Sequence, residues 1–460
     1  MKTTVKTLLT ESPVDTEVVV KGWVRTKRGS KQVTFLEIND GSCFASMQVI
    51  LDNKNFSNEI LQKLRTGTSV KITGKLVASP APQQPVELQG TKIKIYGEAA
   101  ADYQLQKKRH SFEFLREIAH LRTRTNTFGA VFRIRNILAK AVHDFFQERN
   151  FIYLHSPIIT TSDCEGAGEM FNVTNFDLNN IPLTKNNKVD WEQDFFGKMA
   201  GLSVSGQLEA EIFACSLGDC YTFGPTFRAE NSNTSYHLSE FWMVEPEIAF
   251  GDLEDDMDLA EDFIRYLIKA VLEKGKDDLE FFDKRISKGK LKALEKLADA
   301  PFNRISYTDA ISKLEKKSNK FEFKPKWGMD LQTEHERYLT EKVFKGPVFV
   351  TDYPKDIKAF YMRMNKDGKT VAAMDALLPA VGEIIGGSQR EERYDLLAAR
   401  IKEMGLELSD YDWYLDLRKY GTVPHSGFGL GFGRMVQFVT GMKNIRDIIP
   451  FPRTPGNAKF

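Results

Sequence analysis

The sequence lacks the features that mark secreted, membrane-spanning and disulfide-rich proteins. Only four cysteines occur among 460 residues, at positions 43, 164, 215 and 220, and no two have CxxC spacing. This excludes a disulfide framework and a cysteine zinc pair, and it favours a reducing compartment. No run of about 18 apolar residues is present, which excludes a membrane span. Residues 1–17 carry acids and no apolar core, so they are neither a signal nor a transit peptide. We therefore expect a cytoplasmic protein.

Several common catalytic signatures are also missing. The chain has no GxxxxGK[ST] phosphate loop and no GxSxG nucleophile turn, and its glycine run at 429–433 does not match the GxGxxG dinucleotide fingerprint. The seven histidines form no cluster with metal-ligand spacing. These absences exclude P-loop enzymes, Rossmann dehydrogenases, α/β-hydrolases and a zinc site built from protein ligands alone.

Charge is balanced overall but unevenly placed along the chain. The formal net charge is +1, yet residues 1–125 hold 20 Lys and Arg against 12 Asp and Glu, which leaves 44 against 51 in the remainder. A basic N-terminal part favours contact with a polyanion such as a nucleic acid. The alternative is a chance split of solvated surface charge.

Residues 1–100 predict a small all-β domain. Five short stretches rich in β-branched residues lie at 18–24, 33–41, 45–51, 69–77 and 92–96. Five short strands with little helix fit a closed barrel of the OB type. We expect a basic loop at 26–30 and Phe35 on the strand that follows, an arrangement suited to the stacking of unpaired bases. The alternative places Phe35 in the barrel core.

The rest of the chain predicts a linker at 101–127 and a larger domain at 128–460. Helical spacing marks residues 128–149, which end at Asn150 as a C-cap. The strand predicted at 152–160 contains Pro157, so it is an edge, a bend or an interface strand. Further elements are a helix capped by Asp258 and running to Lys274, strands at 348–350, 359–364 and 371–378, and insertions near 172–200 (polar) and 276–345 (charged, helical and at the surface).

The first stretch that carries chemistry lies at 224–247 and predicts a strand, a polar loop and a return strand. Arg228 at a strand end can clamp a phosphate, Glu230 can accept from an adenine amino group, and Phe241 can cover a base. The alternative is a salt-bridged hairpin with no ligand.

The second stretch lies at 424–435 and has glycine at every second position, 427, 429, 431 and 433. On a strand these four glycines share one face, which leaves bare backbone against which a flat ligand can lie. Arg434 follows at the strand end, and a helix is expected from Met435 to about Gly441.

These residues carry a family resemblance. Phe227-Arg228-Ala229-Glu230 with His237 resembles motif 2 of class II aminoacyl-tRNA synthetases, and the glycine strand ending in Arg434 resembles motif 3. Ser156-Pro157 after a long helix is similar to motif 1, the dimer-forming strand. A barrel ahead of these motifs resembles the aspartyl, asparaginyl and lysyl subgroup, and FRAENSNTSYHLSEFWMVEPE, MDALLPAVGEIIGGSQREER and YGTVPHSGFGLGF are most similar to its asparaginyl branch. The resemblance implies an α+β fold, an N-terminal OB-fold barrel followed by an antiparallel sheet flanked by helices.

The resemblance also implies an ATP site. Arg228 would hold the α-phosphate, and Arg434 would cover one face of the adenine while Phe241 stacks under the other. Glu230 would meet the adenine end, and His237 would meet the γ-phosphate. The implied Mg²⁺ ligands are Glu383 and, as a second candidate, Asp375.

For the amino acid, the resemblance implies that Glu165 holds the α-ammonium beside Gln207. Arg390 would donate to the amide oxygen of asparagine, and Glu245, with Glu240 as the alternative, would accept from its NH2 group. That pairing would repel aspartate by placing two carboxylates face to face. For the anticodon, the implied contacts are Phe35 by stacking, Gln48 by reading a base edge, and Arg25 and Lys27 by touching phosphate or base. A homodimer with Pro157 in its interface is also implied.

Two positions depart from the family pattern. Gly433 stands where the last motif usually has Glu, and Gly386 stands where aspartyl relatives often have Ser near the metal. The main hypothesis is an enzyme that joins asparagine and ATP and charges tRNA(Asn). The alternatives are an aspartyl or non-discriminating enzyme, a tRNA-independent paralogue that makes asparagine, and a nucleic-acid-binding protein with an inactive synthetase body.

Overall fold

The computed structural model describes residues 3–11, 13–82, 84–106, 108–164, 170–232 and 234–460. The chain divides into two compact units, one made of Met1–Arg133 with Phe460 and the other of Ile134–Lys459. Helix α5 (Asn126–Gln147) crosses the boundary between them. The predicted C-cap of this helix, Asn150, has the left-handed backbone typical of that position, with φ of 65°.

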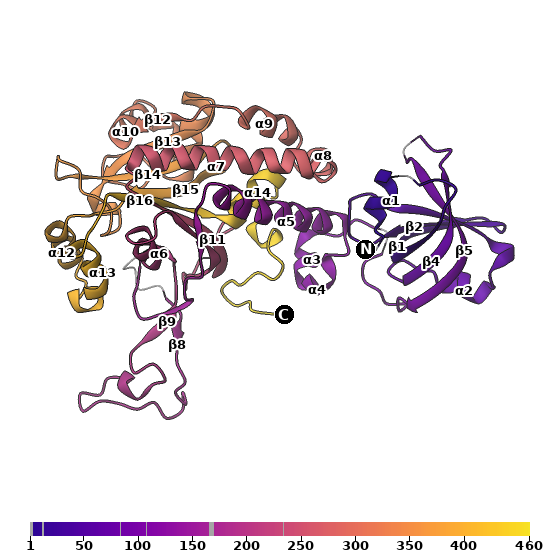
Figure 1. The fold of residues 1–460 in the computed structure, drawn as a ribbon, viewed down its shortest axis with the longest axis horizontal. Helices are drawn as coiled ribbons and strands as arrows, with labels where there is room; N and C mark the ends of the chain where they lie inside the picture. Colours follow the sequence, from indigo (N-terminus) through magenta and orange to yellow (C-terminus); the bar gives the residue numbers. More distant parts are fainter. Residues whose placement is uncertain (1–2, 12, 83, 107, 165–169, 233) are drawn as a thin grey trace. The chain divides into compact units, whose positions relative to one another are not determined.

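Unit 1 contains a closed five-stranded barrel, as the sequence predicts (Figure 1). In the order β1-β2-β3-β5-β4 around the barrel, the strands are β1 (Glu17–Gly29), β2 (Val33–Asn39), β3 (Met47–Asp52), β5 (Val86–Gly97) and β4 (Ser69–Ala78). Along β2 every second side chain is buried, so Leu36 and Ile38 fill the core while Phe35 stays half-buried on the outer face. The alternative that placed Phe35 in the core is therefore wrong.

Parts of unit 1 differ from the prediction. The basic residues 26–29 are the end of β1 rather than a loop, because this strand continues past a bulge between Val24 and Thr26. β5 begins at Val86, well before the predicted residue 92, because Val86 and Leu88 fill the core. Four short helices were not predicted, and the last two replace part of the expected linker: α1 (Val5–Glu11), α2 (Asn58–Lys63), α3 (Phe112–Glu117) and α4 (Ala119–Arg122).

Unit 2 is built on an eight-stranded sheet with the order β12-β13-β14-β15-β16-β11-β10-β6. The strands in that order are β12 (Asn303–Ser306), β13 (Val348–Pro354), β14 (Thr370–Leu378), β15 (Gly382–Gln389), β16 (His425–Gly431), β11 (Glu240–Ala249), β10 (Cys220–Phe227) and β6 (Ile152–Leu154). The six central strands are antiparallel, and only the two edge strands pair in parallel with their neighbours. The antiparallel sheet implied by the family resemblance is thus confirmed.

Helices flank this sheet, with the long helix α7 (Leu253–Lys274) packed across β14, β15 and β16 (Figure 1). The N-cap of α7 is Asp252 and not the predicted Asp258, because Asp252 and Asp255 form a reciprocal capping box. The other α-helices in the described part of the unit are α6 (Gln207–Ala214), α8 (Lys276–Arg285), α9 (Lys290–Leu297), α10 (Tyr307–Glu315), α11 (Thr333–Tyr338), α12 (Tyr394–Glu403), α13 (Asp412–Lys419) and α14 (Phe432–Thr440). Helix α14 starts three residues earlier than predicted and ends at Gly441, whose φ is 70°.

Three predicted segments of unit 2 need correction. The strand expected at 152–160 is broken near Pro157 into the edge strand β6 and β7 (Ile159–Thr160), which joins a small sheet with β9 (Ala200–Leu202) and β8 (Asn172–Val173). Residues 359–364 form only isolated bridges instead of a strand. The segment 276–345 is not a surface insertion alone, because it supplies edge strand β12 and the apolar side of α10, which packs on β13.

The polar segment between β8 and β9 extends away from the sheet as an arm (Figure 1). Its apolar side chains include Leu178 and Phe195, which are 73% and 76% exposed. The polar segment near 172–200 is therefore exposed, as predicted, and its status as an insertion stays a prediction. Within the described part of the chain, no helix has both the length and the apolar character needed to cross a membrane.

Candidate active site

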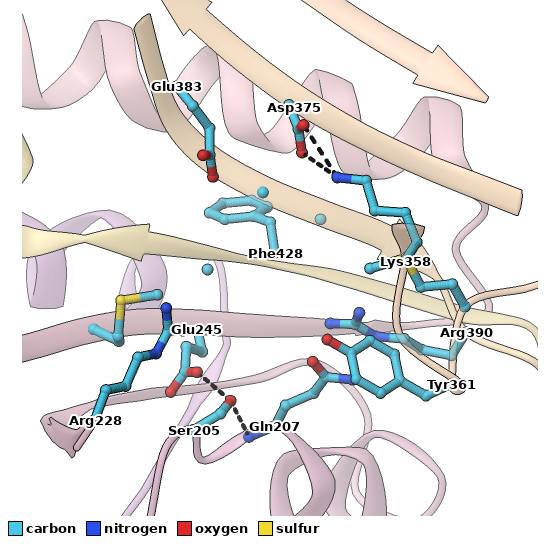
Figure 2. A pocket seen from close by; sticks show the side chains of 15 residues that line it. Ser205, Gln207, Arg228, Glu245, Lys358, Tyr361, Asp375, Glu383, Arg390 and Phe428 are labelled. Carbon is cyan, nitrogen blue, oxygen red and sulfur yellow. Dashed lines mark hydrogen bonds and ion pairs between the residues drawn. The ribbon is translucent and has the colours of Figure 1, made fainter. Parts of the chain in front are cut away.

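Two adjoining cavities lie over β10, β11, β15 and β16. The first is lined by Ser205, Gln207, Arg228, Met243, Glu245, Lys358, Tyr361, Met362, Asp375, Glu383, Gly386, Gly387, Arg390, Phe428 and Gly429 (Figure 2). The second is lined by Arg228, Glu230, Tyr236, His237, Leu238, Phe241, Met243, Glu383, Ile384, Gly429, Gly431, Gly433, Arg434 and Ile445. Arg228, Met243, Glu383 and Gly429 line both, so the two cavities meet at these residues.

The alternating glycines of β16 let the two cavities reach the backbone of the sheet. A Cβ atom on Gly429 would lie 2.7 Å from the Met243 methyl, and one on Gly431 would approach only the Arg434 side chain, at 3.6 Å. A Cβ on Gly427 would instead lie 2.3 Å from the Pro246 carbonyl oxygen, so that glycine serves close strand packing. The prediction that all four glycines share one strand face is wrong for Gly433, which lies inside α14.

The second cavity brings together the residues predicted from the two motifs. Arg228 follows the end of β10, and its guanidinium lies 5.4 Å from the centre of the Phe241 ring on the neighbouring strand. Arg434 in the first turn of α14 donates to the Glu383 carbonyl at 3.3 Å, and its Nη1 lies 3.6 Å from the Glu383 carboxylate. The alternative of a hairpin without a ligand site is not supported, because the hairpin borders a cavity rather than closing on itself.

The other two predicted nucleotide residues also line the second cavity. Glu230 and His237 lie in the loop between β10 and β11. The Nδ1 atom of His237 is within hydrogen-bond distance of the Thr234 and Ser232 hydroxyl groups, at 2.5 and 3.2 Å. These contacts hold the ring within the loop while the residue borders the cavity.

The first cavity contains a nearly buried arginine whose charge is already balanced. Arg390 follows β15, donates through Nε and Nη2 to both oxygens of Glu247, and donates through Nη1 to the Ser388 hydroxyl at 2.8 Å. Burial lowers the pKa of Arg390, but the ion pair with Glu247 outweighs it and holds the pKa above its ordinary value. An arginine has five N–H groups, so two remain for a ligand.

Glu245 is the second residue predicted to contact the side chain of the amino-acid ligand, and it lines the same cavity. Its carboxylate accepts from the Ser205 hydroxyl, from the Gly206 amide at 3.1 Å and from the Thr222 hydroxyl at 2.9 Å. A carboxylate has about four acceptor positions, so one remains. The alternative residue, Glu240, does not line either cavity.

Carboxylates gather at the other end of the first cavity. Both oxygens of Asp375 accept from the Lys358 ammonium at 3.1 Å, a pair that Figure 2 shows beside Glu383. Burial and the charge of Glu383 raise the pKa of Glu336, on α11, to about 8. A Cβ on Gly386 would lie 3.2 Å from Glu383 Oε1 and 3.5 Å from Asp375 Oδ1, so glycine leaves open the space that these two carboxylates face.

These carboxylates fit a magnesium ion only in part. In the described residues, no group of three or more His, Cys, Asp or Glu side chains has the geometry to hold a metal. Glu383 and Asp375 nevertheless face one open space, and Mg²⁺ is commonly held by one or two carboxylates together with phosphate oxygens. The donor set therefore fits an ion that arrives with a nucleotide.

The barrel places two of the four predicted anticodon residues together. Phe35 and Gln48 lie on the outer face of the paired strands β2 and β3. Arg28, which the sequence interpretation missed, lies with its guanidinium 5.6 Å from the Phe35 ring centre and donates to Gln48 at 3.2 Å. Lys27 instead donates to the Leu61 carbonyl, and Arg25 is half-buried, which lowers its pKa.

Two other predicted residues stand apart from these groups. Glu165 lies outside the described residues. Pro157 is exposed between β6 and β7, next to the exposed apolar side chains of Ile158 and Ile159. Residues that the sequence gave no reason to select also line the first cavity, namely Lys358, Tyr361 and Ser205. Their partners are distant in sequence, so no local pattern marks them.

The comparisons with known proteins agree with this geometry. A family model described as class II tRNA synthetases (D, K and N) matches residues 111–455, and a model of an OB-fold nucleic acid binding domain matches residues 18–96. The chain belongs to the class II tRNA synthetases. This synthetase is 61% identical to an asparagine–tRNA ligase from Treponema denticola over 99% of each chain. It is 59% identical to one from Acetivibrio thermocellus over 100% of each chain.

Solved structures give the same relationship. This synthetase has a TM-score of 0.86 and 34% identity, over 99% of each chain, with asparaginyl-tRNA synthetase from Pyrococcus horikoshii complexed with asparaginyl-adenylate. It has a TM-score of 0.83 and 28% identity with the Entamoeba histolytica asparaginyl-tRNA synthetase in complex with asparaginyl-adenylate, over 97% of each chain. The family resemblance and the fold class inferred from the sequence are therefore confirmed.

Proposed function

We propose that this class II synthetase activates asparagine with ATP and transfers it to the 3′ end of tRNA(Asn). In the first step the α-carboxylate of asparagine attacks the α-phosphorus of ATP, which forms asparaginyl adenylate and releases pyrophosphate. In the second step the 3′-terminal hydroxyl of the tRNA attacks the acyl carbon and releases AMP. The relatives named asparagine–tRNA ligase over the whole chain support this reaction.

The observation that carries the proposal is the meeting of the two cavities at Arg228 and Glu383. One cavity has an aromatic ring, an arginine and a backbone floor suited to adenine, and the other has paired donors and acceptors suited to a small polar side chain. A bond between two ligands in these cavities would form beside Arg228. A guanidinium there stabilises the negative charge that develops on the phosphoryl group.

The first cavity favours a side-chain amide over a carboxylate. Two free N–H groups of Arg390 can donate to the amide oxygen, and the remaining acceptor position of Glu245 can accept from the amide NH2. Because Glu247 neutralises Arg390, aspartate would meet no unbalanced cation there and would face the Glu245 carboxylate. Both features support asparagine as the substrate.

For the nucleotide, we propose that Arg228 holds the α-phosphate, that Phe241 and Arg434 cover the two faces of the adenine, that Glu230 meets the adenine end, and that His237 meets the γ-phosphate. Glu383 and Asp375 would hold Mg²⁺, which supplies positive charge to the phosphate oxygens when bound. Asp375 accepts hydrogen bonds from Lys358 through both oxygens, whereas the cation beside the Glu383 carboxylate, Arg434, lies 3.6 Å away, so Glu383 is the stronger of the two ligands.

For the tRNA, we propose that Phe35 stacks on an anticodon base and that Gln48 reads a base edge, with Arg25 and Lys27 near the backbone. Arg28 joins this group because it lies beside both Phe35 and Gln48. We also propose a homodimer with Pro157 in the interface, supported by the exposed apolar side chains around this residue. The low cysteine content, four in 460 residues, supports a cytoplasmic site of action.

The test is amino-acid-dependent exchange of pyrophosphate into ATP, followed by charging of tRNA(Asn). We expect exchange with asparagine and little with aspartate. Equal exchange with aspartate would reassign the enzyme as aspartyl or non-discriminating. Free asparagine made from aspartate, ATP and ammonia would reassign it as a tRNA-independent synthetase, and a folded protein with no exchange would leave only nucleic-acid binding.

A further inference from the structure

Glu211 is a buried carboxylate next to a residue that lines the first cavity, and it has no part in the proposed function. Glu211 lies on α6, four residues after Gln207, and its side chain is 0% exposed. Its oxygens accept from the Tyr414 hydroxyl at 2.8 and 2.7 Å and from Arg418 at 2.7 Å, and His425 Nε2 lies 2.9 Å away. Helix α13 and strand β16 thus bring three donors to one acid.

The fourth partner of Glu211 is the side-chain amide of Gln207, which lines the cavity. Gln207 Nε2 donates to Glu211 Oε1 at 3.0 Å. An ionised carboxylate only accepts hydrogen bonds, whereas an amide can present either a donor or an acceptor. With its amide reversed, the oxygen of Gln207 would face the oxygen of Glu211, and two acceptors would repel each other. Glu211 therefore decides which end of the Gln207 amide faces away from it.

The surroundings keep Glu211 in the accepting form. Burial alone would raise the pKa of Glu211, but the charge of Arg418, the hydrogen bond with His425 and the charge of Arg390 outweigh it and hold the pKa below its ordinary value. Glu211 can therefore not reverse its role by becoming a donor. The Gln207 amide then presents its oxygen toward the first cavity, from the position that Figure 2 shows below Tyr361 and Arg390.

From these contacts we infer that Glu211 is a positioning residue that aims the Gln207 oxygen at the α-ammonium of the bound amino acid. An amide oxygen held in this way accepts from an ammonium group and cannot donate to a carboxylate. The residue acts through Gln207 and does not touch the substrate. The inference depends on the proposed function, because it assumes that an amino acid occupies the first cavity.

The test compares asparagine with succinamate, which keeps the α-carboxylate and the side-chain amide but has hydrogen in place of the α-ammonium. In Glu211→Gln, residue 211 can also donate, so the Gln207 amide loses its fixed orientation. We expect the KM for asparagine in pyrophosphate exchange to rise about 10- to 100-fold, because a hydrogen bond to a charged group is lost. The inhibition constant of succinamate and the KM for ATP should stay near their wild-type values.

The matched control is Glu209→Gln, the same substitution two residues earlier on α6, at a position that lines neither cavity. We expect it to keep the wild-type KM for asparagine. If Glu211→Gln does not fold, Glu211→Asp keeps the charge for Arg418 and His425 but withdraws the oxygen from Gln207, and it should show the same selective loss.

Different outcomes separate the possible failures. Equal weakening of asparagine and succinamate would mean that Glu211 only supports the structure of the cavity, for example through Arg390, whose Nε lies 4.0 Å from Glu211 Oε1. No change for either ligand would also overturn the inference. Absence of asparagine-dependent exchange in the wild-type protein would instead refute the proposed function itself.

Discussion

Gly427 and Gly429 lie on the same face of β16 but have different surroundings. This difference gives a testable prediction. In Gly429→Ala the new Cβ would approach the terminal methyl of Met243 to 2.7 Å, and the end of that flexible side chain can move aside. In Gly427→Ala the Cβ would meet the Pro246 carbonyl oxygen at 2.3 Å and the Glu247 side chain at 2.5 Å. The Pro246 backbone and the buried Glu247 carboxylate, which is paired with Arg390, cannot move aside as easily as the Met243 side chain.

The two variants should therefore separate stability from binding. Forced packing of a methyl against fixed atoms costs about 1–3 kcal/mol, so Gly427→Ala should unfold at clearly lower denaturant concentration. Gly429→Ala should unfold close to the wild type, because Met243 can move. Its methyl and the displaced Met243 would enter the space where both cavities meet, so the KM values for ATP and asparagine should rise together.

The assays are denaturant unfolding and pyrophosphate exchange with each substrate varied in turn. The reasoning would be refuted if Gly429→Ala bound ATP and asparagine like the wild type, because ligands would then not lie against β16. It would also be refuted if the two alanines destabilised the protein equally, because the distances to the backbone would then not decide the cost.

Three further predictions test other parts of the molecule. Arg228→Ala should lower the rate of pyrophosphate exchange by about 100-fold or more. Phe35→Ala should leave pyrophosphate exchange unchanged and weaken tRNA binding during charging by about 1–3 kcal/mol, the contribution of one stacked base. Loss of both activities in the Phe35 variant would contradict the assigned roles. Lys358→Met leaves the Asp375 carboxylate, which is 15% exposed, without the lysine as its ion-pair partner. Denaturant unfolding should therefore show a loss of about 3 kcal/mol in the free energy of unfolding, and the double variant Lys358→Met/Asp375→Asn should regain part of it. A double variant no more stable than Lys358→Met would contradict the pairing. Burial raises the pKa of Cys215 to about 11, so mass spectrometry should find its alkylation rising about tenfold per pH unit from pH 8 to 10, and a pH-independent rate in the folded protein would exclude that shift.

The elements that the sequence predicts well are those whose pattern is local. Alternation along 33–39 identifies β2, and alternate glycines identify β16, because both reflect the two-residue repeat of a strand. The cap of α7 was misplaced because both Asp252 and Asp258 precede apolar helical residues. Only the reciprocal bonds between Asp252 and Asp255 distinguish the true start.

The site is predictable only where its residues lie inside such patterns. Arg228 and Arg434 stand at the ends of elements with recognisable sequences, whereas Lys358 lies outside any strand and its partner is 17 residues away on β14. Glu211 had a usable signal, because residues four apart on a helix meet on one face and Gln207 was already selected. The bond from Gln207 could have been inferred, but the donors from α13 and β16 could not.

Gly433 shows how tertiary context changes the meaning of a motif position. Gly433 stands where the family pattern usually has Glu, directly before Arg434. In the structure a Cβ at Gly433 would point to the side chains of Ile448 and Ile445, at 3.1 and 3.6 Å. The side chain of an acidic residue at this position would therefore point from its Cβ toward apolar side chains. The carboxylate beside Arg434 comes instead from Glu383 on β15, so the charge of this arginine is balanced across the sheet rather than from its neighbour in sequence.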